Sequence, residues 1–159
     1  MVGVFKLFLA ALLLCTIAAF FAAPSSLAAQ DRGYWTAASS NAKSITGDIT
    51  IGATKLGINF AGFPLAPIRQ LTKDEGSAAF DVVGNEGLGG ELYRLTVPAS
   101  RRFLHHNTLC GTDDTQWMAT YVAGRTLYVD FFSGSEMPKL TIDALANSTN
   151  LCGTFVYAR

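Results

Sequence analysis

Two adjacent pairs of side chains have the residue types for acid–base or metal chemistry. His105-His106 could ligate a metal or act as a general base, and Asp113-Asp114 could supply carboxylates. Adjacent residues on a strand point to opposite faces, so neither pair converges on one atom, and no third ligand at metal spacing is nearby. A hydrolase that uses either histidine with either aspartate is therefore the least favoured hypothesis. The sequence predicts no enzyme, no metal site and no cofactor.

Two glycine-containing stretches also fail to match a catalytic motif. Residues 87–90 lack the Gly-x-Gly-x-x-Gly spacing and the strand-to-helix context of a phosphate loop, and Ser133-Gly134-Ser135 is not a nucleophile elbow. With these motifs excluded, the polar loops are the candidate functional surface, because loops carried by a rigid scaffold are common binding surfaces. The candidate binding residues are Arg101, Arg102, His105, His106, Ser133, Ser135 and Lys139.

The elements that position these loops belong to an exported chain, because residues 1–29 have the pattern of a cleavable signal peptide. Lys6 precedes an uncharged apolar run over residues 7–23, and small residues precede a cleavage site after Ala28 or Ala29. The alternative is an uncleaved anchor, since the run nearly reaches the roughly 20 residues that span a bilayer. We expect a periplasmic or secreted protein with no stable membrane span after cleavage.

Residues 30–159, which remain after cleavage, are expected to form a single domain that is close to neutral. Of the 12 Lys and Arg only Lys6 is lost, against 12 Asp and Glu, which leaves a net charge of about −1. Such a balance provides no electrostatic footprint for nucleic acid or for an anionic membrane. The length and the aromatic content suit one β-rich core.

Cys110 and Cys152 are the cysteines that remain once Cys15 leaves with residues 1–29. An even pair in an oxidising compartment predicts a disulfide. It would close a loop of 42 residues (152 − 110), for which chain entropy gives about 4 kcal/mol of stabilisation. A redox pair would favour Cys-x-x-Cys spacing and a zinc site would need further ligands, and neither pattern is present.

Alternation of apolar and polar residues predicts strands over most of residues 30–159. It is clean from Ile45 to Ile51, which we expect to form a hairpin with residues 55–60, and it recurs over 91–97 and in the runs around Trp117 and Val129. The sequence thus predicts an all-β fold, a small antiparallel barrel or sandwich of about eight strands with one short helix and one disulfide.

Three further expectations concern local structure. Residues 78–83 are expected to form a strand, and residues 137–146 are the stretch expected to be helical. Gly124 favours a three- or four-residue hairpin loop over a strict two-residue turn, in which Ala123 would also need a positive φ.

The last third of the chain resembles small exported bacterial β-proteins that are uncharacterised. The residues that carry the resemblance are Asn107-Thr108-Leu109-Cys110-Gly111, Trp117, Phe131-Phe132-Ser133-Gly134 and residues 151–157. It implies a periplasmic location and no particular activity. A weaker resemblance is to the periplasmic inhibitors of c-type lysozyme, disulfide-containing β-barrels with a Ser-Gly-rich functional loop. Ser133-Gly134-Ser135 begins in the same way, whereas residues 136–139 depart from that loop.

The leading hypothesis is a non-enzymatic periplasmic binding or inhibitor module that acts on a protein or other envelope component through its surface loops, here residues 101–107 and 133–139. The alternative is a calycin-like carrier, because an eight-stranded barrel can enclose one small ligand. Aromatic residues such as Trp117, Tyr121, Tyr128 and Phe132 would suit its lining.

Overall fold

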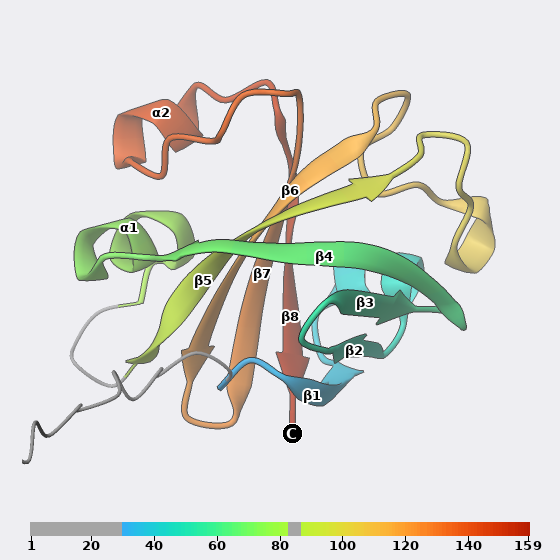
Figure 1. The fold of residues 1–159 in the computed structure, drawn as a ribbon, viewed down its shortest axis with the longest axis horizontal. Helices are drawn as coiled ribbons and strands as arrows, with labels where there is room; N and C mark the ends of the chain where they lie inside the picture. Colours follow the sequence, from blue (N-terminus) through green and yellow to red (C-terminus); the bar gives the residue numbers. More distant parts are fainter. Residues whose placement is uncertain (1–29, 83–86) are drawn as a thin grey trace, which may run out of the picture.

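The computed structural model describes residues 30–82 and 87–159, and the signal-peptide prediction lies outside them. The chain forms a closed antiparallel barrel in which every strand pairs with its neighbour in sequence and β1 closes on β8 (Figure 1). This confirms the all-β prediction and selects the barrel over the sandwich. The strands are β1 (Gly33–Ala37), β2 (Ile49–Ile51), β3 (Lys55–Ile58), β4 (Ala61–Gln70), β5 (Gly87–Val97), β6 (Thr115–Ala123), β7 (Thr126–Ser133) and β8 (Leu151–Ala158).

The barrel interior is filled by apolar side chains, as expected for a barrel of this strand number. All eight strands contribute, because residues that alternate along each strand point inward. The largest of these side chains are 0–1 % exposed, and Phe131 packs edge-on against Phe155 with ring centroids 5.2 Å apart. They include Trp35, Ile49, Leu56, Met118, Phe131, Phe155 and Tyr157.

A second apolar layer covers the outer face of β5, β6 and β7. It is built from the residues that point away from the interior, among them Leu92, Trp117, Tyr121 and Phe132, and it is covered by α1 (Lys73–Phe80) and α2 (Ile142–Ala146). Both helices lie on the left of Figure 1, away from β2 and β3. Gly76 allows α1 to approach closely, because a Cβ there would lie 2.7 Å from the ring of Tyr121.

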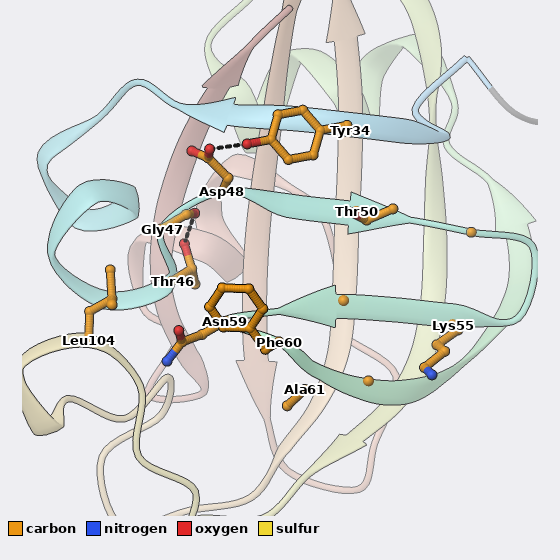
Figure 2. Close-up of a pocket in the computed structure, with 13 residues that line it drawn as sticks. Tyr34, Thr46, Gly47, Asp48, Thr50, Lys55, Asn59, Phe60, Ala61 and Leu104 are labelled. Carbon is orange, nitrogen blue, oxygen red and sulfur yellow. Dashed lines mark hydrogen bonds between the residues drawn. The ribbon is translucent and has the colours of Figure 1, made fainter.

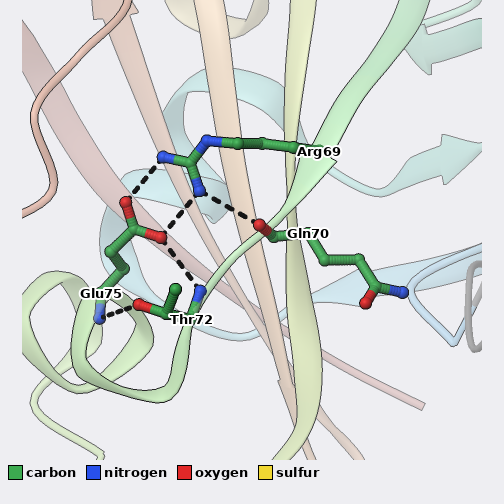
Figure 3. A network of polar contacts seen from close by, with 4 residues as sticks. All are labelled: Arg69, Gln70, Thr72 and Glu75. Atoms are coloured by element: carbon green, nitrogen blue, oxygen red, sulfur yellow. Dashed lines mark hydrogen bonds and ion pairs between the residues drawn. The ribbon is translucent and has the colours of Figure 1, made fainter.

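The first turn of α1 is held by a polar network (Figure 3). Thr72 caps the helix by accepting from the backbone N–H of Glu75 at 3.2 Å, and Glu75 accepts in return from the backbone N–H of Thr72 at 2.9 Å. The Arg69 guanidinium donates to both carboxylate oxygens of Glu75, at 2.6 and 2.7 Å. This capping box explains why a short, weakly amphipathic stretch is helical.

Four connections meet at one end of the barrel. They are the π-helical turn η1 (Ala42–Thr46), the two-residue β3–β4 turn, the β5–β6 loop with its 3₁₀ turn η2 (Leu104–His106), and the β7–β8 connection with α2. The predicted disulfide between Cys110 and Cys152 is present and ties the β5–β6 loop to β8.

Several local predictions were wrong. Of the strand expected over 78–83, residues 78–80 belong to α1, which the Thr72 cap starts at Lys73, residues 81 and 82 are in no strand, and residue 83 lies outside the described residues. The strand expected from Ile45 begins only at Ile49, since Gly47 is left-handed (φ 62°) and Thr46 bonds back to the carbonyl of Ala42. The helix expected over 137–146 is confined to α2, and a second helix, α1, was not expected.

The β6–β7 hairpin also differs from the prediction. Ala123 pairs with Thr126, so the turn has two residues, Gly124 and Arg125. Of these only Gly124 has a positive φ, of 57°. A type II′ turn needs a positive φ at its first central residue alone, so Ala123 can remain in the strand.

Candidate functional site

A groove of about 710 Å³ lies on the outer face of β1 to β4 (Figure 2). Its floor follows one cross-strand row, in which Tyr34 pairs with Thr50, Thr50 with Gly57 and Gly57 with Gly62. Residues directly opposite one another on paired strands share a face, so all four face outward. The row therefore runs from an aromatic side chain through a hydroxyl to two residues without side chains, and it leaves a trough that is open over Gly57.

Gly57 is not required by the backbone. Its φ is not in the left-handed region, and an added Cβ would lie 3.5 Å from the Cβ of Thr50, an ordinary van der Waals contact. Glycine in a strand interior costs about 0.5–1 kcal/mol relative to alanine. The chain thus has a destabilising residue at the centre of the groove, at a position where a larger one would fit the fold.

Tyr34 forms one wall and is held in place by Asp48. The Tyr34 hydroxyl donates to Asp48 Oδ2, and the backbone N–H of Ala37 donates to Asp48 Oδ1 at 2.8 Å. The hydrogen bond from the Tyr34 hydroxyl, and after it the one from the Ala37 amide, lowers the pKa of Asp48. The hydrogen bond to Asp48 in turn raises the pKa of Tyr34. The ring is 61 % exposed but fixed at its hydroxyl end.

Phe60 stands at the tip of the β3–β4 turn, at the opposite side of the groove from Tyr34 (Figure 2). Asn59 and Phe60 are the two residues between the paired Ile58 and Ala61, and both have positive φ, 47° and 64°. This is the geometry of a type I′ turn, in which asparagine is favoured first and glycine second. A left-handed phenylalanine costs about 1–2 kcal/mol, and its relative exposure of 109 % means that no packing offsets that cost.

Three polar side chains around the groove are available to a ligand. Within residues 30–82 and 87–159, the side chains of Thr50, Lys55 and Asn59 make no hydrogen bond or ion pair to protein. The Lys55 stem lies over Gly62, where an added Cβ would be 1.8 Å from Lys55 Cε. The groove thus offers a hydroxyl, an amide and an ammonium around an apolar floor.

The loop predicted at residues 101–107 borders this groove through Leu104. His105 and His106 are exposed and both have positive φ, 54° and 61°. Arg102 donates to the carbonyl of Ala99 at 2.8 Å, and Arg101 lies 5.8 Å from the ring of Phe103.

The other predicted loop lies elsewhere. Ser133 is 6 % exposed and lines a polar depression of about 440 Å³ together with Asp113, Asp114 and other polar residues. Ser135 is exposed and its carbonyl accepts from Arg94 at 3.2 Å. Lys139 is exposed too. The two predicted loops emerge from the same end of the barrel, but only residues 101–107 touch the groove.

The histidine and aspartate pairs do not form a shared centre in the described part of the chain. His105 and His106 lie on η2, whereas Asp113 and Asp114 line the polar depression, and Asp114 accepts from the backbone N–H of Ala99 at 2.8 Å. Across residues 30–82 and 87–159, no three His, Cys, Asp or Glu side chains are grouped so that they could hold a metal ion.

A buried carboxylate occupies one end of the barrel interior. Asp31 is 4 % exposed, and its Oδ2 accepts from the hydroxyls of Tyr93 at 2.7 Å and Thr120 at 2.8 Å. Arg159 covers this end, because its guanidinium lies 3.9 Å from the ring centre of Trp35 and donates to the carbonyl of Arg32 at 2.7 Å. These residues plug the interior, in which the carrier hypothesis would place a ligand.

Tyr34, Asp48, Lys55 and Phe60 were not among the candidate residues predicted from the sequence. An indication in the sequence was Asn59-Phe60 at the end of the run 55–60, because a two-residue turn favours asparagine followed by glycine. A phenylalanine at that second position is the departure that could have marked the groove.

No protein-family model, no curated protein and no solved structure matches this chain. In the described residues no helix has the length and apolar character needed to cross a membrane.

Proposed function

We propose that the protein is a non-enzymatic, exported binding or inhibitor-type module that holds its ligand in the groove over β1 to β4. The observation that carries the proposal is Phe60, a fully exposed ring in a strained backbone conformation at the groove's edge. Strain of this kind persists where the surrounding structure imposes it, and it concentrates at functional sites. Glycine at position 60 would relieve it, so retention of the ring is best explained by contact with a partner.

Gly57 supports the same proposal, because here a side chain is absent where the fold would allow one. There the chain lacks a side chain that the strand would accommodate, and at position 60 it has a side chain that the turn disfavours. Both departures from local preference create the trough. Departures that agree in this way are expected where a sequence has been shaped for function and not for stability.

Binding fits the site better than catalysis does. The groove contains one carboxylate, that of Asp48, and it already accepts two hydrogen bonds. The large side chains in the interior favour a ligand on the outside of the barrel over one carried within it. The disulfide between Cys110 and Cys152 is the kind of bond that persists in an oxidising compartment, which supports export.

The test is capture of envelope components by the exported protein and by two variants. Gly57→Thr fills the trough with a residue that favours strands, and Ala66→Thr makes the same kind of change at an exposed position of β4 outside the groove. We expect wild type and Ala66→Thr to retain a component that Gly57→Thr loses, although all three unfold at similar urea concentrations.

Phe60→Gly provides a second variant in the same assay. It should lose the captured component while its free energy of unfolding stays the same or rises by about 1 kcal/mol, because the left-handed strain is removed. If wild type and Gly57→Thr retain identical material, whether protein, glycan or small molecule, the groove is not the binding site and the proposal fails.

A further inference from the structure

We infer that the ligand of this groove is an uncharged glycan chain, which stacks its sugar rings on Tyr34 and Phe60 across the glycine floor. The inference rests on the function proposed above, because it names the chemistry of the molecule that the groove holds. Three features of the groove support it: its charge balance, its combination of flat rings with free polar groups, and the pairing of its central strands.

The charge balance favours an uncharged ligand. Asp48 and Lys55 are the charged side chains that line the groove, one of each sign. Asp48 is already engaged by the Tyr34 hydroxyl and the Ala37 amide. One exposed ammonium is too little to attract a polyanion, which requires a basic stripe or patch. Neither nucleic acid nor a strongly acidic polysaccharide fits this surface.

The aromatic rings and the polar groups match the two kinds of surface on a sugar. The ring face of a pyranose carries C–H groups, which pack on the electron-rich face of an aromatic side chain. Its edges carry hydroxyls, which would meet the free side chains of Thr50, Lys55 and Asn59. Strands lie about 4.8 Å apart, so the row from Tyr34 to Gly62 extends about 14 Å, enough for more than one ring.

The backbone disfavours an extended peptide, the other chain-like ligand of this size. Peptides that bind to sheets add a strand at an open edge, where main-chain hydrogen bonds provide the affinity. Here the two central floor strands are paired on both sides, with β2 between β1 and β3, and β3 between β2 and β4, whereas Tyr34 of β1 and Gly62 of β4 pair on one side each. Over Thr50 and Gly57, at the centre of the groove, a ligand therefore meets side chains and rings but no free ladder of N–H and C=O groups.

The experiment is an NMR titration of the exported protein with two uncharged oligosaccharides, cellohexaose and the N-acetylglucosamine hexamer. A pool of uncharged decapeptides is titrated in parallel. We expect at least one oligosaccharide to shift the backbone amides of Thr50, Gly57 and Gly62. The informative variant is Phe60→Leu, which keeps the exposed apolar side chain and the strained turn but removes the flat ring.

Stacking predicts that Phe60→Leu weakens oligosaccharide binding about tenfold, the equivalent of one aromatic contact. Gly57→Thr should weaken it at least as much, and Ala66→Thr should leave it unchanged. Equal binding by wild type and Phe60→Leu would overturn stacking and with it the glycan assignment. Shifts produced by the decapeptides and not by either sugar would overturn the glycan assignment while leaving the groove as a binding site.

If neither the oligosaccharides nor the decapeptides shift any amide signal, the assignment to these glycans is overturned as well. The capture assay then tests the proposed function separately. If capture still depends on Gly57, the groove binds a ligand of other chemistry. If capture is independent of Gly57 as well, the proposed function and the glycan inference fail together.

Discussion

Asp130 provides a sharp test of the second apolar layer, because it is a carboxylic acid buried within it. It lies on the outer face of β7, paired with Ala119 of β6 on one side and Thr154 of β8 on the other, and it is 1 % exposed. Neither of its oxygens has a hydrogen bond of normal geometry within the described residues. The change to make is Asp130→Asn, which keeps the size of the side chain and removes the ionisable group.

The magnitude follows from the pKa. Burial raises the pKa of Asp130 from the ordinary 3.8 to about 7, and the Thr154 hydroxyl offsets a part of that rise. At about 1.4 kcal/mol per pH unit this corresponds to about 4 kcal/mol, an upper value for the penalty of ionising the buried group. Between pH 4 and pH 7 the folded state binds more protons than the unfolded state, so the free energy of unfolding falls as pH rises.

Urea titrations of wild type and Asp130→Asn from pH 4 to pH 8 measure this penalty. The two proteins should be about equally stable at pH 4, and the variant should be more stable by up to about 4 kcal/mol at pH 8. Asp113→Asn, which removes an exposed carboxylate, is the matched control and should show no such gain. A stability difference between wild type and Asp130→Asn that does not change with pH would refute the reasoning.

Two further predictions concern the α1 network and the disulfide. Glu75→Gln keeps an oxygen that can accept from Thr72 but breaks the ion pair with Arg69, whose hydrogen bonds hold the pKa of Glu75 at about 2, below the ordinary 4.5. Between pH 2 and pH 4.5 the folded wild type binds fewer protons than the unfolded wild type, so the ion pair's stabilisation of about 1 kcal/mol is present above pH 4.5 and is lost as pH falls toward 2. Urea midpoints of wild type and variant that differ equally at pH 6 and pH 2 would contradict this. Replacing both Cys110 and Cys152 with alanine opens the 42-residue loop and should lower the free energy of unfolding by about 4 kcal/mol. A loss below 1 kcal/mol in denaturant titrations would contradict the chain-entropy origin of this stabilisation.

Predictions from the strand period were confirmed in the β6–β7 hairpin. In the alternating run around Trp117, Trp117, Ala119 and Tyr121 lie together in the outer layer, and in the run around Val129, Val129 and Phe131 lie in the interior. Strand alternation is a local property, since successive side chains point to opposite faces whatever the rest of the chain does. The disulfide was predictable for a different reason, because two cysteines allow one pairing.

Predictions failed where a hydrogen bond overrode the pattern. Alternation at Ile45 and Gly47 indicated a strand, but Thr46 turns inward, and its hydroxyl lies 2.7 Å from the hydroxyl of Tyr157. The strand β4 contains Pro64 and Pro67, residues that cannot donate to a strand ladder. It survives because residues 61–64 pair with β3 and residues 65–70 pair with β5, so each half has one edge where a missing N–H costs little.

The sequence by itself determined the strand content, the single disulfide and the face of most strand residues, because these depend on neighbours in the chain and on residue chemistry. Tertiary structure alone decided the groove. Tyr34, Gly57 with Phe60, and Leu104 come from three separate segments, and only strand register and barrel closure place them around one trough. Register couples residues that are distant in sequence, and a shift by one residue would turn the whole row inward.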